Sequence, residues 1–201
     1  EAYRDELEGM ERQARTNLDS SVALVNTVAA HILNSGGKRI RPFLLLLSAR
    51  LCGYTGCDHH QLASLVEFIH TASLLHDDVV DEADIRRGRR TARKVWGNQI
   101  SILVGDYLYS KAFCQVVDFH HHGINEVLGE ACKKMAEGEV LQLYYNGNPS
   151  MSEAEYLKIV EYKTAGLIAA ACRMGAMLAD ASEAQQDALF RFGLHLGVAF
   201  Q

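Results

Sequence analysis

An acidic segment set among apolar residues constrains the fold of this chain more than any other feature. The segment is LLHDDVVDEADIRRG, residues 74–88, and it contains Asp77, Asp78 and Asp81. At about 100° per residue, the three carboxylates occupy roughly one quarter to one third of a helix circumference. Like charges held so closely on an apolar helix need a cation to balance them, and oxygen-rich carboxylate sets suit Mg²⁺. The alternative is a solvated acidic face, but the apolar turns before the aspartates and the arginines after them favour a metal site.

Helical periodicity dominates the rest of the sequence, whereas alternating strand patterns are almost absent. We therefore predict one all-α domain over residues 1–201, a bundle rather than a solenoid. The expected helices cover residues 2–16, 20–33, 60–85, 98–117 and 124–145, and further helices begin after Ser152 and after Ser182. Each of these serines stands three residues before a Glu or Gln, which is the capping-box pattern.

Composition excludes several classes of protein. Of the 201 residues, 48% are hydrophobic, which suits a sizeable core. The net charge of −5 and the absence of long basic runs argue against a nucleic-acid partner. Five scattered cysteines without CxxC spacing indicate reduced thiols in a cytosolic protein. Because no apolar run is long enough to span a membrane and the charged start is unlike a secretory signal, we expect a cytoplasmic protein.

Basic residues complement the aspartates. One cluster lies in NSGGKRIRP, residues 34–42, and a second consists of Arg86 and Arg87. Lys163 stands alone among apolar residues, where the alternative to a functional role is a snorkelling side chain. His70 precedes Asp77 by two helical turns and is either a satisfied core histidine or a donor to a phosphate. Two basic clusters beside one acidic cluster indicate two anionic substrates, only one of them held through a metal.

The motifs GGKRIRP, EFIHTASLLHDDVVDEADIRRG, VGDYLY, EGEVLQL, YKTAG and GVAFQ resemble, in order and spacing, those of the trans-isoprenyl diphosphate synthases. The resemblance implies an all-α, isoprenoid-synthase-type helical bundle around a deep central cavity, normally a homodimer. It also implies a Mg²⁺-dependent prenyltransferase. An allylic diphosphate ionises at the aspartates, and isopentenyl diphosphate, held by basic residues, attacks the resulting cation.

The resemblance also implies a role for individual residues. Asp77 and Asp81 would be the main magnesium ligands with Asp78 beside them, and these three with Lys163 form the implied catalytic set. The residues implied to bind isopentenyl diphosphate are Lys38, Arg41, His70 and Arg87. Those implied to contact the allylic diphosphate or its cation are Arg86, Lys163, Thr164 and Gln201. Glu139 receives no role. The family carries a second aspartate-rich motif shortly after the AFQ segment, so we expect this chain to be truncated before it.

Product length follows from helix geometry. One turn rises about 5.4 Å, close to the length of an isoprene unit, and the growing chain should run from the aspartates toward the N-terminus of their helix. Ala72 and Ser73 are small where short-chain members carry an aromatic floor, and Ile69 would line the tunnel beyond them. We expect hexaprenyl or longer products, with octaprenyl favoured, for quinone side chains. Ala72→Phe should shorten the product to about C15–C20, because a packed tunnel cannot accommodate the ring.

Three other functions are weighed against this one. A terpene cyclase also ionises allylic diphosphates at such a motif, but it needs no second diphosphate site. A non-catalytic subunit of a synthase has no need of an intact aspartate motif. A purely structural bundle leaves the charged clusters unexplained. A hydrophobic product implies at most transient contact with a membrane.

Overall fold

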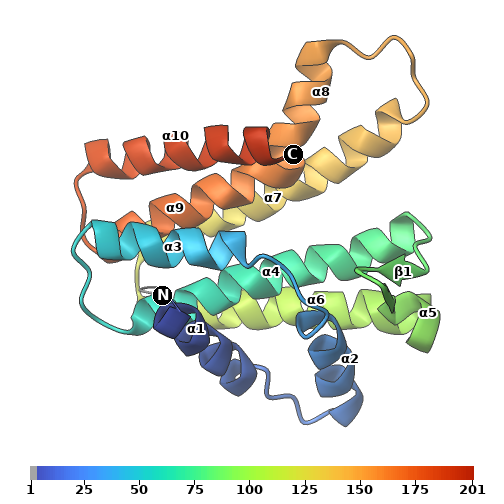
Figure 1. Cartoon of the computed structure of the whole chain (residues 1–201), viewed down its shortest axis with the longest axis horizontal. Coiled ribbons are helices and arrows are strands. Elements are labelled where there is room, and N and C mark those ends of the chain that lie inside the picture. Colours follow the sequence, from blue (N-terminus) through green and yellow to red (C-terminus); the bar gives the residue numbers. More distant parts are fainter. Residues whose placement is uncertain (1–3) are drawn as a thin grey trace. The chain divides into compact units, whose positions relative to one another are not determined.

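The computed structural model describes residues 4–201 and is helical throughout most of that range (Figure 1). The α-helices are α1 (Arg4–Asn17), α2 (Ala23–Leu33), α3 (Ile40–Leu51), α4 (Asp58–Val80), α5 (Ala92–Trp96), α6 (Asn98–Val116), α7 (His122–Tyr145), α8 (Glu153–Val160), α9 (Gly166–Leu178) and α10 (Glu183–Phe200). A 3₁₀ turn, η1 (Val117–Phe119), follows α6, and a π-helical turn, η2 (Glu161–Ala165), joins α8 to α9. Two short strands, β1 (Ile85–Arg86) and β2 (Arg89–Arg90), form the sheet structure of the described residues.

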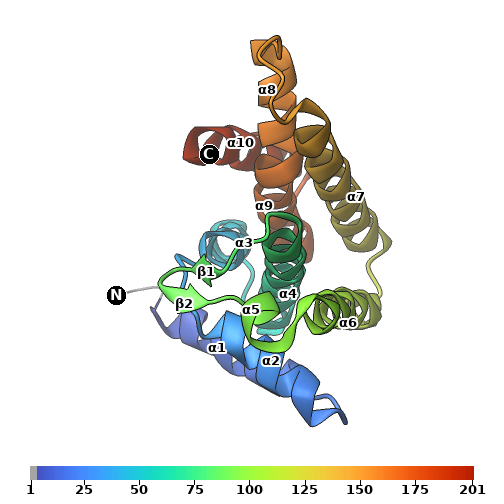
Figure 2. The same ribbon diagram turned by 90° about the vertical axis from the view of Figure 1, so that its right-hand side faces the viewer.

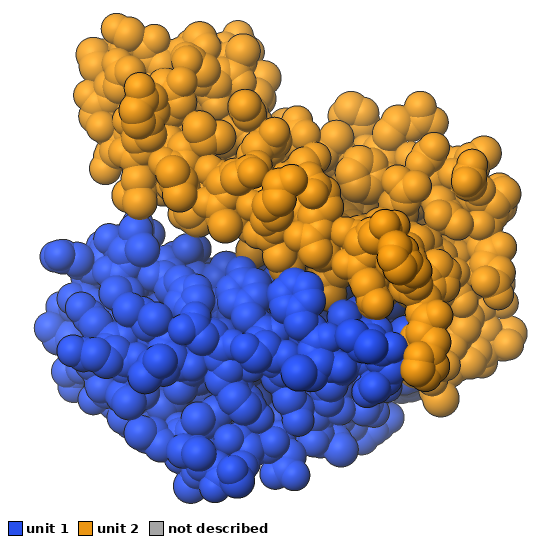
Figure 3. All heavy atoms as spheres, turned by 180° about the vertical axis from the view of Figure 1, so that it is seen from behind, with its two compact units in different colours: residues 1–39, 60–119 blue, residues 40–59, 120–201 orange. Residues whose placement is uncertain are grey.

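The chain forms two compact units (Figure 3). Unit 1 contains the described residues up to Arg39 together with residues 60–119, and unit 2 contains residues 40–59 and 120–201.

Unit 1 is built around the apolar length of α4. Leu65, Phe68 and Ile69 of this helix have no solvent exposure. Hydrogen bonds from polar side chains hold α1 and α6 against α4. Asn17 at the end of α1 donates a buried 3.1 Å hydrogen bond to Ser64 Oγ, and the Ser101 hydroxyl of α6 donates one of 3.0 Å to the Leu75 carbonyl. Buried polar groups that are paired in this way fix the register of the helices as well as their contact.

Unit 2 is built around α9, on which α3, α7 and α10 pack. Small residues make these contacts close. A Cβ added at Gly175 would lie 2.4 Å from the Leu45 carbonyl oxygen, and one added at Gly193 would lie 2.7 Å from Ala169 Cα. Cys172 is fully buried against Leu44 and Ile168, and burial raises the pKa of its thiol to about 11.

The predicted all-α fold and both predicted capping boxes are confirmed. The predicted start of the first helix at residue 2 lies outside the described residues. Helix α7 begins at His122, two residues before the predicted start at residue 124, and the His121 side chain accepts a hydrogen bond from the Ile124 amide and caps the helix. No described helix is both long and apolar enough to cross a membrane.

The prediction of a continuous helix over residues 60–85 is wrong at its C-terminal end. Helix α4 ends at Val80, where the Ala83 amide bonds back to the Asp78 carbonyl and Glu82 takes a left-handed conformation with φ 51°. This pattern is a Schellman cap with Glu in the place usually taken by glycine. The β1–β2 hairpin, green in Figures 1 and 2, follows at once. Its turn residues Arg87 and Gly88 both have positive φ, as a type I′ turn requires.

Candidate functional site

The three predicted aspartates lie at the C-terminal end of α4 in unit 1. The Asp81 amide donates a 2.8 Å hydrogen bond to the Asp77 carbonyl, so helical geometry extends to Asp81. Asp81 is exposed and Asp77 is partly exposed, whereas Asp78 has an exposed fraction of 1%. The three carboxylates are therefore not equivalent: two of them have access to solvent and one does not.

Asp78 pairs with Arg86 of the hairpin. The Arg86 Nε donates a 2.8 Å hydrogen bond to Asp78 Oδ1, which places the start of β1 against the last turn of α4. Burial raises the pKa of Asp78, and the neighbouring guanidinium opposes that shift in part. Asp78, predicted beside the metal ligands, and Arg86, predicted to contact the allylic diphosphate, thus bind each other, a pairing that the sequence does not predict.

Arg87, the second arginine of the hairpin, contacts the glycine pair Gly36–Gly37. Arg87 donates a hydrogen bond to the Gly36 carbonyl, and a Cβ at Gly37 would lie 2.6 Å from Arg87 Nη1. Gly37 has φ 145°, a conformation that other residues rarely adopt, so the backbone requires glycine there. Lys38 is exposed directly after this pair. Lys38 and Arg87 are about 50 positions apart in the sequence, and the structure brings the segments that carry them together. Both residues are predicted to bind isopentenyl diphosphate.

Arg39 and Arg41, in the same basic run, have different environments. Arg39 belongs to unit 1, where its guanidinium bonds to the Glu67 carboxylate and the Leu33 carbonyl, so it holds the loop against α4. Arg41 lies in the first turn of α3 in unit 2 and is partly buried. His70 is partly buried on α4.

The residues predicted to set product length differ in exposure. Ala72 and Ile69 have no accessible surface, whereas Ser73 keeps some. The Ser73 hydroxyl donates a 2.8 Å hydrogen bond to the His70 carbonyl, one turn earlier on α4. Of these three positions, Ser73 is therefore the one that can meet a ligand without rearrangement.

Lys163 lies in unit 2 within the π-helical turn η2. Its Nζ donates a 2.8 Å hydrogen bond to Glu139 Oε2 of α7, and both side chains are partly buried. π-Helical turns within helices are frequent at functional sites, because the extra residue redirects the side chains that follow.

Thr164 and Gln201, which the sequence analysis assigned to one substrate, meet in unit 2. The Thr164 hydroxyl donates a 3.0 Å hydrogen bond to Gln201 Oε1. Gly197 permits this contact, since a Cβ there would lie 2.5 Å from Ala165 Cα. The close packing of α10 on η2 thus aligns the end of α10 with the turn that carries Lys163.

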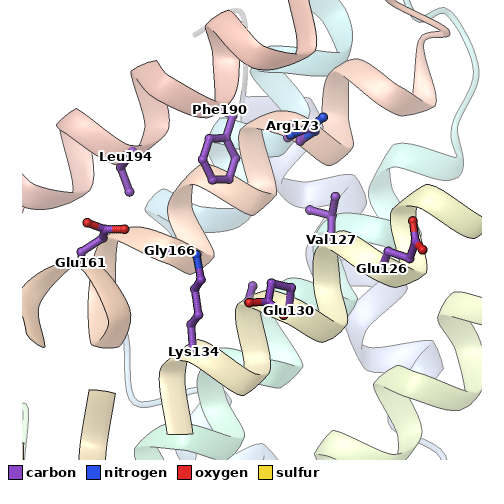
Figure 4. A pocket seen from close by; sticks show the side chains of 10 residues that line it. Glu126, Val127, Glu130, Lys134, Glu161, Gly166, Arg173, Phe190 and Leu194 are labelled. Carbon is purple, nitrogen blue, oxygen red and sulfur yellow. The ribbon is translucent and has the colours of Figure 1, made fainter. Parts of the chain in front are cut away.

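A cavity of about 330 Å³ opens in unit 2 between α7, α9 and α10 (Figure 4). Arg173 lies on its wall with its guanidinium 5.8 Å from the centre of the Phe190 ring and 3.3 Å from Asp187 Oδ1. The cavity is mainly apolar with charged groups such as Glu130 and Lys134 at its edge. None of the predicted site residues lines it, so the cavity and the predicted chemistry are separate features.

Comparison with known proteins identifies the family. The polyprenyl synthetase family model matches residues 22–201. The chain belongs to the polyprenyl synthetase family. This synthetase chain is 43% identical to the octaprenyl diphosphate synthase of Escherichia coli K12 over 196 residues, which are 98% of the chain and 61% of that protein.

Solved structures agree with this assignment and confirm the isoprenoid-synthase fold. The polyprenyl synthetase chain superposes on a decaprenyl diphosphate synthase from Rhodobacter capsulatus with a TM-score of 0.97 and 45% identity, covering 100% of this chain and 62% of that one. A polyprenyl synthase from Caulobacter crescentus, solved with calcium and isoprenyl diphosphate, gives a TM-score of 0.97 at 42% identity, with 100% and 61% covered. The chain therefore spans less than two thirds of the length of each of these relatives.

The sequence does not predict two ion pairs among the candidate site residues, Asp78–Arg86 and Lys163–Glu139. The Asp78–Arg86 pair could not be seen, because it depends on a two-residue turn that reverses the chain after α4. Glu139 receives no role from its motif EGEVLQL, although a carboxylate on a partly apolar helix is a signal for a partly buried partner.

Proposed function

We propose that this member of the polyprenyl synthetase family is a magnesium-dependent trans-prenyltransferase acting in the cytoplasm. It condenses an allylic diphosphate, with farnesyl diphosphate as the primer, with successive molecules of isopentenyl diphosphate. The observation that carries the proposal is the arrangement at the end of α4. Two accessible carboxylates, Asp77 and Asp81, lie within one turn, and Arg87 is anchored to the loop that presents Lys38. The family model runs through both compact units, which supports treating residues 1–201 as one synthase domain.

The donor set at the end of α4 fits magnesium. Asp77 and Asp81 offer carboxylate oxygens at helical spacing, and hard oxygen ligands are those that Mg²⁺ prefers, usually together with substrate phosphates. The Caulobacter relative was solved with calcium, another hard divalent cation, and with isoprenyl diphosphate. Bound magnesium would neutralise the diphosphate and stabilise the charge that grows on it as it leaves. Asp78 supports this site by pairing with Arg86, which keeps the hairpin beside the two accessible aspartates.

In the proposed reaction, the bond between C1 of the allylic chain and the diphosphate oxygen breaks, leaving an allylic cation and a diphosphate. Lys163 and Arg86 stabilise the negative charge that develops on the leaving group. Thr164 and Gln201 offer oxygens to the cation. Lys38, Arg41, His70 and Arg87 hold isopentenyl diphosphate. Its double bond attacks C1, a carbon–carbon bond forms, and the departing diphosphate accepts the proton that is then lost.

We propose a long all-trans product, with octaprenyl diphosphate favoured, as the precursor of a quinone side chain. Some similar proteins are named for octaprenyl and decaprenyl products, and others for nonaprenyl, heptaprenyl and geranylgeranyl products. Small residues at Ala72 and Ser73 support a long product, because neither of these two positions carries an aromatic side chain.

We propose that the synthase is a homodimer. Helix α6 and the turn after it expose apolar side chains within an arc of about 100°: Ile102, Leu103, Phe113 and Val117, with exposed fractions from 37% to 61%. Exposed Asp106 and Ser110 lie within the same arc between the two pairs, so this face carries an apolar pair at each end. Exposed apolar side chains gathered on one face are typical of a protein interface. Light scattering should give twice the monomer mass, and Leu103→Glu should shift the protein toward the monomer. A monomeric parent protein would contradict the assignment.

Binding of labelled isopentenyl diphosphate tests the synthase against its rivals. A terpene cyclase needs no site for this second diphosphate, and a non-catalytic subunit would bind without turnover. We expect the protein at its natural length to bind isopentenyl diphosphate and to lose at least about tenfold in affinity in Arg41→Ala, because a charge-assisted bond to phosphate is removed. Arg50→Ala, a change at the far end of the same helix, is the matched control. Absence of binding to the parent protein would favour the cyclase.

A further inference from the structure

The backbone and side-chain conformation of Lys163 depends on contacts with α7, and no local sequence pattern links α7 with Lys163. Lys163 lies in the five-residue turn η2, where the Gly166 amide bonds to the Glu161 carbonyl in the i to i+5 pattern. Such turns are rare, and they persist where surrounding contacts hold them. The direction of the Lys163 side chain therefore depends on what packs against η2.

Gly138 of α7 packs closely against the backbone of this turn at Lys163 itself. A Cβ added at Gly138 would lie 2.7 Å from the Lys163 amide nitrogen, 3.1 Å from Lys163 Cα and 3.0 Å from Tyr162 Cβ. The Lys163 backbone leaves no room for any side chain at this position. Gly138 lies in the interior of α7, so close packing explains this glycine, not a turn.

Glu139, the next residue, reaches the other end of Lys163. Its Oε2 lies 2.8 Å from Lys163 Nζ, with exposed side-chain fractions of 27% and 22%. A lysine ammonium has three donors on a flexible four-carbon stem. One donor is directed by Glu139, and among the described residues the structure pairs the ammonium with no other carboxylate. Glu139 thus fixes the position of the ammonium and leaves donors for a further anionic group.

Resting on the proposed function, we propose that Glu139 is a positioning residue that holds the Lys163 ammonium where it meets the allylic diphosphate, with Gly138 setting the turn beneath it. Glu139 does not touch the substrate in this account. Its carboxylate opposes the binding of an anion and favours catalysis only through Lys163. Removing it should therefore lower turnover without weakening the binding of the allylic substrate.

Steady-state kinetics of the protein at its natural length test this assignment. In Glu139→Ala, we expect kcat to fall about 10- to 100-fold, the size expected when a catalytic group is misplaced by about 1 Å, while KM for farnesyl diphosphate stays equal or falls. Glu139→Gln keeps an oxygen acceptor for Nζ and should remain within about threefold of the parent. Glu137→Ala, which removes an exposed carboxylate from the same helix, is the matched control and should leave both constants unchanged.

Three kinetic results would overturn the proposal. If Glu139→Gln is as inactive as Glu139→Ala, the carboxylate acts by accepting a proton. If KM rises while kcat is unchanged, Glu139 belongs to the binding surface. If Glu139→Ala lowers activity equally in the parent and in a Lys163→Ala background, the two residues act independently. We expect instead that Lys163→Ala and the double variant have the same kcat/KM, because a residue acting through Lys163 has no effect once Lys163 is gone.

Chemical labelling separates this inference from the proposed function. Acetic anhydride modifies lysine amines, and mass spectrometry compares Lys163 with exposed Lys158 as an internal reference. We expect Glu139→Ala to raise acetylation of Lys163 several-fold and to leave Lys158 unchanged, because the ion pair holds the ammonium against Glu139 and restricts access of the reagent to it. This result supports the positioning of Lys163 even if the parent protein makes no product. An unchanged rate at Lys163 would overturn the inference even in an active synthase.

Discussion

The Nε of Arg86 donates a 2.8 Å hydrogen bond to Oδ1 of Asp78, a carboxylate with an exposed fraction of 1%. The three neighbouring aspartates therefore differ in role. Asp78 joins α4 to the β1–β2 hairpin, whereas Asp77 and Asp81 retain accessible surface. The hairpin also carries Arg87, so the pair indirectly fixes the position of a residue proposed to bind isopentenyl diphosphate.

Removing Arg86 should destabilise the protein. In Arg86→Ala, the buried Asp78 carboxylate loses its charged partner, and we expect a loss of about 2–3 kcal/mol in the free energy of unfolding. Urea denaturation at neutral pH measures this loss. Asp78→Asn in the Arg86→Ala background should recover part of it, because a neutral amide costs less to bury. Arg89→Ala, at an exposed position of the same hairpin, should cost less than about 1 kcal/mol. Equal losses in Arg86→Ala and Arg89→Ala would contradict the pairing.

The two accessible aspartates should be essential for product formation. Asp77→Asn and Asp81→Asn each remove a hard, charged oxygen ligand, and we expect activity to fall by about three orders of magnitude. Glu82→Gln is the matched control, because Glu82 is an exposed carboxylate directly beside Asp81. Its activity should stay within about twofold of the parent. Initial rates at several magnesium concentrations provide the measurement. A strong loss of activity in Glu82→Gln would show that overall acidity, not these two positions, matters.

An aromatic ring on α4 below the aspartates should shorten the product. Ala72→Phe and Ser73→Phe should both yield chains of about C15–C20, because the ring fills space that a longer chain would need. Ala72 has no accessible surface, so Ala72→Phe should also cost about 1–3 kcal/mol in stability, and Ser73→Phe should cost less. Chromatography of the extracted products and thermal unfolding give the two readouts. An unchanged product length in both variants would rule out this face of α4 as a wall of the product tunnel.

Thiol labelling should follow burial. Cys57 and Cys114 are exposed, whereas Cys172 is buried and its pKa is raised to about 11. At pH 8 only about one Cys172 side chain in a thousand would be a thiolate, and the reagent would also lack access. We expect Cys57 and Cys114 to react within minutes and Cys172 only after denaturation. Between pH 8 and pH 10 Cys172 should stay unlabelled in the native protein, because its burial denies the reagent access. Labelling of native Cys172 as rapid as that of Cys57 would contradict the packing of α9.

The sequence predicts most of the fold for identifiable reasons. Apolar spacing locates the long helices, and Ser152 and Ser182 mark two helix starts because their side chains satisfy amides at N3. Local signals also bring the aspartates onto one turn of α4. The juxtaposition of Thr164 with Gln201 followed from the family resemblance, since no local pattern links residues 37 positions apart.

What the sequence does not predict depends on backbone conformations without a clear local signal. The left-handed Glu82 ends α4 five residues before the predicted end, and non-glycine residues rarely take this role. The hairpin that follows is only two residues long on each side, too short for a strand pattern. The π-helical turn at Lys163 depends on packing against Gly138, which lies on another helix. Each of these features positions a residue of the candidate site.

The elongation reaction itself tests the central claim most directly. The protein at its natural length is incubated with farnesyl diphosphate and labelled isopentenyl diphosphate, with magnesium or with a chelator, and the extracted products are separated by chain length. We predict a labelled long-chain polyprenyl diphosphate, octaprenyl favoured, that forms only with magnesium. No incorporation of label, or a cyclic product made from farnesyl diphosphate alone, would contradict the account.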